Sequence, residues 1–284
     1  MVDIRQTQEY ANYLKTLGWT TYRKAGVNYF VKKIALSGIL KIQRPETLDL
    51  ETIREIAKLH KVFNIVVEPK TEIDARFLLQ NRFKQSKSPF LPTKTLLIDL
   101  TKTKESLWKD LNKKTRYSIK KYTNKNTGRG ESFEIKKFFS PPEIEDFRKA
   151  WKKNVKTKRY VPSAKQLKNL AKSFKKHKPL FLASHNKNAE IVAGAIFTQS
   201  SSKISYYWQA FSGKNGRSSL SGYTLLWHGI LWAKSQGCKL MDLEGIYDPR
   251  FPNKSWQGFS HFKKSFGGEE REYPGAFVKY QLPF

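Results

Sequence analysis

The chain has 284 residues, with 54 Lys and Arg against 24 Asp and Glu, which gives a formal net charge of +30. Hydrophobic residues make up 39% of it and aromatic residues 14%, enough for a large core, which excludes intrinsic disorder as well as collagen-like and coiled-coil classes. The single cysteine, Cys238, excludes a disulfide framework and a Cys-rich zinc site. The five histidines show no metal-ligand spacing, so we expect neither a metal nor a cofactor.

The first half of the chain alternates predicted helices and strands. Apolar spacing of three and four residues, with N-capping or C-terminal stop residues, predicts helices over 8–17, 49–59 and from Thr101 or Thr103 through 113–121. β-rich runs bounded by turn residues predict strands over 27–34, 38–43, 63–67 and 95–100.

The second half shows a clearer order of elements. A strand over 133–138 precedes helices over 141–155 and 163–174, and three strands follow over 179–184, 191–199 and 203–211. A helix over 220–235, a strand over 239–243 and final strands within 273–280 complete the pattern. This order predicts an α+β fold like the core of GNAT-type acyltransferases, and the first half repeats it loosely.

The positive charge is concentrated in residues 101–180, which hold 25 Lys and Arg against 7 Asp and Glu. Within it, 113–121 and 151–160 interleave basic and aromatic residues, a pattern suited to phosphate contacts and base stacking on a polyanion. Two other interpretations stay open here. The lysines could form solvated helix faces that maintain solubility, or they could attract an anionic membrane surface.

The N-terminal residues contain no apolar stretch typical of a signal peptide, and the longest apolar run, 223–233, is about half of the ~20 residues that a membrane span requires. We therefore expect a cytoplasmic protein, with peripheral contact with the cytoplasmic membrane as an option.

A series of motifs after residue 205 is specific in its order and spacing. The segments are Tyr206–Ser212, Gly222–Trp227, Trp232–Lys239, Asp242–Ile246 and Gly258–Gly268, and 98–100 and 114–117 add to them. The series resembles the Fem family of peptidoglycan aminoacyltransferases over residues 95–280, most nearly its short FemX-like members without a helical arm.

This resemblance implies a fold and a reaction. The expected fold is two tandem GNAT-like domains with mixed, largely antiparallel sheets: 1–132, completed by 272–284, and 133–271. The implied activity transfers Gly, Ala or Ser from aminoacyl-tRNA to the stem-peptide amine of a peptidoglycan precursor, building the interpeptide bridge. The acceptor is UDP-muramoyl-pentapeptide or a lipid-linked muropeptide, and we expect the enzyme to be a monomer.

The resemblance also carries roles to particular residues. Phe262 and Lys263 match the family's Phe-Lys pair where the two substrates meet, and a lysine there suits the oxyanion that develops at the ester carbonyl. Tyr206, Tyr207 and Tyr273 match acceptor-contacting tyrosines, and Arg159 and Tyr160 match residues that contact the diphosphate.

Further candidates come from residue type and position. Trp256 lies in a Pro/Asn/Gly-rich segment, which predicts a loop over the site, and its ring suits stacking on a base or sugar. For the tRNA we expect basic contacts from Lys113, Lys114, Arg116, Lys120 and Lys264.

Two alternative functions stay open. One is an acyl-CoA-dependent N-acyltransferase, since Arg217–Gly222 approaches the pyrophosphate-binding turn of those enzymes, although Leu220 replaces its first glycine. The other is a nucleic-acid-binding module without catalysis, which explains the charge but leaves the motif series without a purpose.

Overall fold

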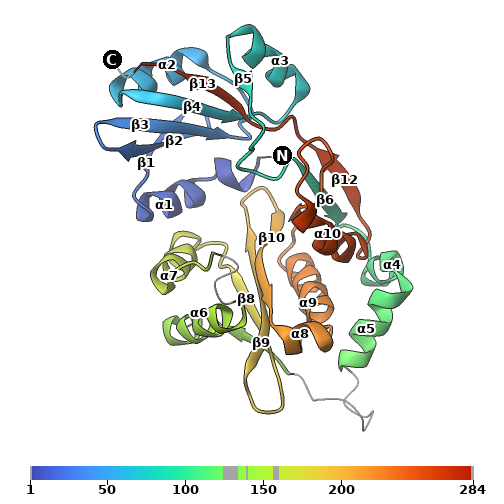
Figure 1. The fold of residues 1–284 in the computed structure, drawn as a ribbon. Helices are drawn as coiled ribbons and strands as arrows, with labels where there is room; N and C mark the ends of the chain where they lie inside the picture. Colours follow the sequence, from blue (N-terminus) through green and yellow to red (C-terminus); the bar gives the residue numbers. More distant parts are fainter. Residues whose placement is uncertain (1, 124–133, 139, 156–159, 283–284) are drawn as a thin grey trace. The chain divides into compact units, whose positions relative to one another are not determined.

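The computed structural model describes residues 2–123, 134–138, 140–155 and 160–282 (Figure 1). The fold is α+β with two mixed sheets, as the sequence predicts. Each sheet contains a parallel pair of strands joined through helical chain. In one sheet, α2 (Leu50–Leu59) joins β3 (Ser37–Gln43) to β4 (Val62–Glu68). In the other, α8 (Lys214–Ser218) and α9 (Ser221–Ser235) lie between β10 (Ile204–Ser212) and β11 (Leu240–Gly245). The other pairings with a defined register are antiparallel.

The chain forms two compact units. Unit 1 contains Met1–Thr95, Gly245–Ser260 and Glu270–Phe284, and unit 2 contains Leu96–Glu244 and His261–Glu269. The sequence-based division into 1–132 with 272–284 and 133–271 stays a prediction about folding domains. The compact units differ from it because they assign 96–132 to the second unit and 245–260 to the first.

Unit 1 is built on a six-stranded sheet of order β1-β2-β3-β4-β13-β5. Its strands are β1 (Thr20–Lys24), β2 (Val27–Ile34), β3 (Ser37–Gln43), β4 (Val62–Glu68), β5 (Lys84–Gln85) and β13 (Phe277–Tyr280). Its helices are η1 (Ile4–Gln6), α1 (Gln8–Thr16), α2 (Leu50–Leu59), α3 (Glu72–Gln80) and η2 (Lys254–Trp256).

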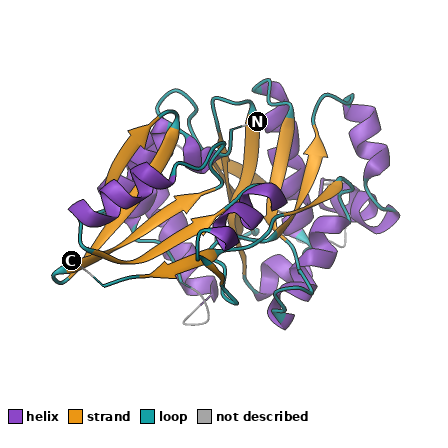
Figure 2. Ribbon diagram, turned by 90° about the horizontal axis from the view of Figure 1, so that it is seen from above, coloured by secondary structure: helices purple, strands orange, loops and turns teal. Residues whose placement is uncertain are grey.

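Strand alternation in unit 1 gives both faces of its sheet an apolar surface. Tyr29 and Val31 of β2 belong to the core beneath α2 and α3, whereas Phe30 packs edge-on against Tyr10 of α1, 5.7 Å between ring centroids. The sheet is therefore covered on opposite faces by α1 and by the pair α2 and α3 (Figures 1 and 2).

Unit 2 is built on a seven-stranded sheet of order β12-β6-β11-β10-β9-β8-β7. The strands of this sheet are β6 (Lys94–Asp99), β7 (Glu134–Phe138), β8 (Leu180–His185), β9 (Ile191–Gln199), β10 (Ile204–Ser212), β11 (Leu240–Gly245) and β12 (Glu269–Glu272). Most of β12, the first two residues of β6 and the last residue of β11 are assigned to unit 1. The helices of unit 2 are α4 (Lys104–Asp110), α5 (Lys113–Thr123), α6 (Pro141–Val155), α7 (Ala164–Ser173), α8 (Lys214–Ser218), α9 (Ser221–Ser235) and α10 (Gln257–Lys264), which starts in unit 1.

An aromatic core fills unit 2. Phe147 of α6 packs edge-on against Phe181 and Phe211, while Phe197 of β9 lies 5.4 Å from the Tyr207 ring on the α9 side. Gly229 of α9 permits that packing, because a Cβ there would lie 2.1 Å from the Phe197 ring. Helices α6 and α9 thus cover opposite faces of this sheet (Figure 1).

Two local predictions are wrong. The helix predicted from Thr101 or Thr103 through 121 is two helices, because the chain is extended at Leu111. Asn112 then caps α5 by accepting a hydrogen bond from the Thr115 amide at 2.7 Å. The predicted loop at Trp256–Phe259 is the end of η2 followed by the first turn of α10.

Candidate functional site

Lys263 lies in the last turn of α10, within unit 2, and only 8% of its surface is exposed. Its ammonium lies 5.8 Å from the centre of the Tyr207 ring, whereas the neighbouring Lys264 is exposed. Burying an ammonium costs free energy unless other groups compensate, so lysines seldom occupy such positions without a structural or chemical reason. Lys263 therefore stands apart from the exposed lysines of this chain.

Rings and hydroxyls fix the backbone that carries Lys263. Phe262 packs edge-on against Tyr223 at 5.0 Å and Phe266 at 5.5 Å. Ser265 donates a hydrogen bond to the Phe262 carbonyl at 2.6 Å and accepts one from the Thr115 hydroxyl of α5 at 2.8 Å. The end of α10 is thus bound to the start of α5 and to α9, which limits the positions that the Lys263 ammonium can take.

Helix α5 presents a basic and aromatic face. Lys113, Tyr117 and Lys120 are all exposed, at the i, i+4, i+7 spacing of one helix face, and Lys120 lies 6.0 Å from the Trp108 ring. Lys114 is exposed as well. Arg116 is instead half-buried and donates hydrogen bonds to the carbonyls of Lys109 and Leu111, so its guanidinium joins α5 to the end of α4.

The remaining predicted residues of unit 2 differ in exposure. Tyr206 is 2% exposed and belongs to the core, while Tyr207, the next residue of β10, lies on the opposite face of the strand, with the Lys263 ammonium near its ring. Tyr160 is 72% exposed and donates a hydrogen bond to Gln166 at 2.8 Å. Arg159 lies outside the described residues.

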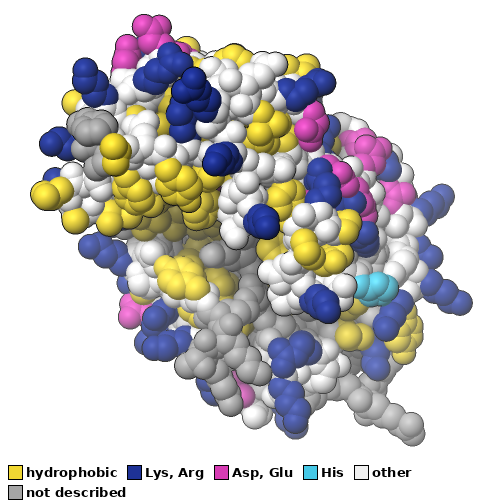
Figure 3. Space-filling view, turned by 45° about the horizontal axis from the view of Figure 1, so that its top comes forward, with side chains coloured by type: hydrophobic (Ala, Val, Ile, Leu, Met, Phe, Trp, Pro, Cys, Tyr) yellow, Lys and Arg dark blue, Asp and Glu magenta, His cyan; other side chains and the backbone are white. Residues whose placement is uncertain are grey.

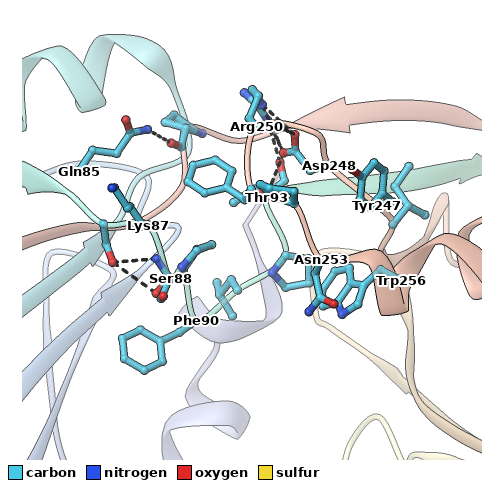
Figure 4. A pocket seen from close by; sticks show the side chains of 18 of the residues that line it. Gln85, Lys87, Ser88, Phe90, Thr93, Tyr247, Asp248, Arg250, Asn253 and Trp256 are labelled. Carbon is cyan, nitrogen blue, oxygen red and sulfur yellow. Dashed lines mark hydrogen bonds and ion pairs between the residues drawn. The ribbon is translucent and has the colours of Figure 1, made fainter.

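Unit 1 contains a cavity of about 1050 Å³ (Figure 4). The segment with Gln85, Lys87 and Ser88 lies on one side of it, and Asp248 and Trp256 lie on the other (Figure 4). Its size suits a ligand of several hundred daltons, since small-molecule pockets typically occupy roughly 300–1,000 Å³.

A buried carboxylate organises one wall of this cavity. Asp248 is 4% exposed, accepts a hydrogen bond from the Thr93 hydroxyl at 2.6 Å, and pairs with Arg250 at 2.8 Å. Burial raises the pKa of Asp248, but the hydrogen bonds from Arg250 and Thr93 and the charge of Arg250 outweigh it and hold that pKa below its ordinary value. Arg250 also donates to the Tyr273 carbonyl at 3.2 Å.

Trp256 lines this cavity and is half-buried, because its ring packs over Gly245, where a Cβ would lie 2.3 Å from it. The Tyr273 ring lies under the guanidinium of Arg44, 3.7 Å from guanidinium carbon to ring centre. Arg44 also pairs with Asp3 at 3.1 Å.

The sequence reasoning missed Arg44, Asp248 and Arg250. For the last two a signal existed, since Asp-Pro-Arg in a turn-rich segment favours a carboxylate that accepts hydrogen bonds from the residues after it. Arg44 follows an ordinary strand, and no local pattern marks it.

One carboxylate and one thiol of unit 2 also have defined surroundings. Asp242 is buried and accepts a hydrogen bond from the Glu244 amide at 2.7 Å. Burial raises the pKa of the Cys238 thiol to about 11, which disfavours the thiolate form that a nucleophile requires. The described residues contain no group of three or more His, Cys, Asp or Glu side chains able to hold a metal ion.

Comparison with solved structures places this fold among tandem GNAT-like proteins. A structure of FemX matches with a TM-score of 0.78 and 16% identity over 98% of this chain and 92% of that one. A structure of L-PGS from Bacillus licheniformis matches with a TM-score of 0.63 and 13% identity over 95% and 86%. A tandem GNAT protein from the clavulanic acid biosynthesis pathway matches at 0.57 and 9% identity over 91% and 81%.

The FemAB family model matches residues 131–284, more than half of the chain. The chain therefore belongs to the FemAB family, and the resemblance seen in its motifs is confirmed. By family it is a transferase. No curated protein matches it in sequence. Within the described residues, no helix combines the length and apolar character needed to span a bilayer.

Proposed function

We propose that this protein transfers Gly, Ala or Ser from aminoacyl-tRNA to the stem-peptide amine of a peptidoglycan precursor, building the interpeptide bridge in the cytoplasm. Membership of the FemAB family supports the class of reaction. The observation that carries the proposal is the burial of Lys263 beside Tyr207, on a helix end fixed by Phe262 and Ser265.

The reaction needs positioning and one well-placed positive charge. The stem-peptide amine attacks the ester carbonyl carbon, a C–N bond forms, and the C–O bond to the tRNA ribose breaks. The amine proton passes to the ribose oxygen that leaves. Negative charge develops on the carbonyl oxygen in the transition state, and the Lys263 ammonium stabilises it.

The tRNA is assigned to the basic face of unit 2. Lys113, Lys114 and Lys120 on α5 are exposed, and Lys264 follows Lys263 on α10. Phosphates pair with these ammonium groups, and Tyr117 between Lys113 and Lys120 offers a ring for stacking. Arg116 has a structural role in addition, because it holds α5 to α4.

The acceptor is assigned to the cavity of unit 1, where Trp256 offers a ring to a base or sugar. Tyr273, together with Tyr207, Tyr160 and Arg159, stays a predicted contact of the acceptor. UDP-muramoyl-pentapeptide and its lipid-linked form share the muropeptide, so either fits this assignment.

An acyl-CoA-dependent N-acyltransferase remains the second candidate, on one observation. The N-terminus of the 15-residue helix α9 has no side-chain cap, and helix N-termini bind diphosphates through their first amide groups. One of these amides, that of Tyr223, already donates to the Leu220 carbonyl at 3.1 Å. Against it, Leu220 takes the left-handed conformation at that turn, with φ of 61° and a side chain where a glycine would allow close approach.

A two-arm reaction separates the candidates. Purified protein is incubated with UDP-muramoyl-pentapeptide and either a mixture of charged tRNAs or acetyl-CoA, and mass spectrometry follows the peptide. We expect added amino-acid mass that disappears when RNase is present. An acetyl increase would replace the proposal with the acyl-CoA reaction. If neither arm reacts, the assay is repeated with the lipid-linked acceptor, and no transfer there either would refute the proposal.

A further inference from the structure

One end of the unit 1 sheet carries exposed apolar side chains from three separate segments. They come from the end of β2 with the turn after it, from the end of α2, and from the end of β13 with the residues after it. Their exposed fractions are 46% for Ile34, 90% for Leu36, 68% for Leu59, 70% for Tyr280 and 68% for Leu282. We call these five residues the apolar rim. None of these five side chains belongs to the core of unit 1, which other residues of β2, α2 and β13 help to fill.

Hydrogen bonds show that the three segments are neighbours. The Gly38 amide donates to the Lys61 carbonyl at 3.3 Å, which places the β2–β3 turn beside the α2–β4 loop. The Gln281 amide donates to the Phe63 carbonyl at 3.0 Å, which places the end of β13 on the other side of that loop. The rim is therefore one continuous edge of unit 1.

Basic side chains lie among the residues of the rim, while Glu55, one turn before Leu59 on α2, pairs with Lys24 at 3.3 Å. Lys33, Lys58 and Lys61 are exposed, and residues 32–38, 58–61 and 279–282 contain no Asp or Glu. Figure 3 shows hydrophobic and basic side chains together at the left margin of the molecule, where Figure 1 has the end of β2 and the C-terminal strand. Leucines next to lysines are the combination that anionic lipid surfaces attract, because apolar side chains enter the acyl region while ammonium groups pair with the headgroups.

We propose that the apolar rim docks unit 1 onto a membrane surface with anionic headgroups. A comparison with helix α3 shows why we choose an anionic membrane rather than any apolar partner. It also exposes apolar residues, Ile73 at 71% and Leu79 at 52%, but its first turn carries Glu72 and Asp74, which an anionic surface repels. The proposal goes beyond the transferase function and does not depend on it.

Vesicle flotation tests the docking surface without any assay of activity. The purified chain is mixed with vesicles of equal parts phosphatidylcholine and phosphatidylglycerol, or of phosphatidylcholine alone. We expect binding to the anionic vesicles only. Leu36→Glu with Leu59→Glu should lower the partition coefficient roughly 30-fold or more, because two leucines no longer enter the bilayer and like charges are added. Replacing Lys33, Lys58 and Lys61 by Ala should lower it roughly 10-fold or more, and added salt should shrink that difference.

The matched control is Ile73→Glu with Leu79→Glu, the same chemical change on α3, which should bind vesicles like the parent. Circular dichroism melting verifies that each variant is folded. The proposal is overturned if the parent does not float with anionic vesicles or if the rim variant binds as the parent does. It is also overturned if binding is lost on replacing Lys113 and Lys120 of α5 but not the rim, since the basic face of unit 2 would then be the attachment. A rim variant that changes only the oligomeric state would mark a contact between copies of the chain instead.

Discussion

Single residues in unit 2 differ in chemistry because their surroundings differ. Lys263 and Lys264 are adjacent in sequence, yet the first is buried beside Tyr207 and the second is exposed. A buried, fixed cation acts on a charge that develops at one place, whereas an exposed one adds to the general attraction for phosphates. The two lysines should therefore affect different kinetic constants.

Lys263→Met should lower kcat for aminoacyl transfer about 10²–10³-fold, the usual effect of removing one oxyanion-stabilising group. Lys264→Met should mainly raise KM for aminoacyl-tRNA, because it removes a phosphate contact made equally in ground and transition states. Steady-state kinetics at varied tRNA concentration measures both constants, with exposed Lys239→Met as the control. A Lys263→Met enzyme that is folded and turns over like the parent would contradict the assigned role.

Cys238 should react slowly with alkylating agents. Its sulfur is buried and lies 3.5 Å from the Gln199 side-chain oxygen, and a pKa raised from 9.0 to about 11 lowers the thiolate fraction about a hundredfold at pH 8. Because the folded pKa is the higher one, the stability gained from the neutral thiol is present below pH 9 and is lost as the pH rises toward 11. Iodoacetamide labelling followed by mass spectrometry, in native buffer and in urea, gives the two rates. Equal rates in both solutions would show that the thiol is accessible.

Elements with strong local signals were predictable from the sequence. Asp49, Ser163 and Thr103 each cap the helix that comes after them. The strands β8, β9 and β10 coincide with runs of apolar residues that are bounded by turns. Helix α3 escaped prediction because it buries only Ala75 and Leu78, so its apolar face is narrow. Helix α10 was not predicted because Gly258 and the turn residues before it have low helix propensity.

The candidate site was predictable only where a family motif marked it. Phe262 and Lys263 belong to such a motif, whereas Arg44 and Asp248 depend on contacts across more than forty residues of sequence. Arg44 meets Asp3, and Asp248 meets Thr93. Pairings of this kind arise from tertiary contacts between loop residues and leave no periodic trace in the chain.

The stability of the segment after β11 should depend on the Asp248 carboxylate. Asp248→Asn removes a charged acceptor that is buried and bonded to Thr93 and Arg250, which should lower the free energy of unfolding by about 2 kcal/mol at pH 7. The lowered pKa means that this contribution is present above pH 3.8 and fades as the pH falls through the folded value. Urea unfolding of parent and variant should therefore differ at neutral pH and converge in acid. Asp146→Asn, at an exposed ion pair of α6, is the control and should change little. A difference that persists unchanged below pH 3 would rule out this account.

Over the whole molecule, a net charge of +30 acts through its distribution rather than its total. On α5, lysines lie on either side of an exposed tyrosine, whereas beside the apolar rim of unit 1 lysines lie next to leucines. The first arrangement suits a polyanion with stackable bases, and the second suits an anionic surface with an apolar interior.

Affinity for aminoacyl-tRNA should fall linearly with the logarithm of salt concentration, and Lys113→Ala with Lys120→Ala should reduce that slope by about 2 because two phosphate contacts are lost. Filter binding over a range of salt concentrations measures the slope. The double variant Lys58→Ala with Lys61→Ala removes the same amount of charge beside the apolar rim and should leave the slope unchanged. Equal effects of both variants would mean that the tRNA responds to net charge alone.

The position of β13 in the unit 1 sheet has a consequence for synthesis of the chain. β13 pairs with β4 through Phe277 and Val67 and with β5 through Phe277 and Gln85, so the strand between β4 and β5 comes from residues 277–280. On the ribosome, the first 95 residues emerge with an unfilled slot in their sheet, and all of unit 2 must be translated before that slot is filled. During this interval the β4 edge is exposed to other nascent chains, and a chaperone that shields strand edges would find its target in the part of unit 1 that is made before unit 2.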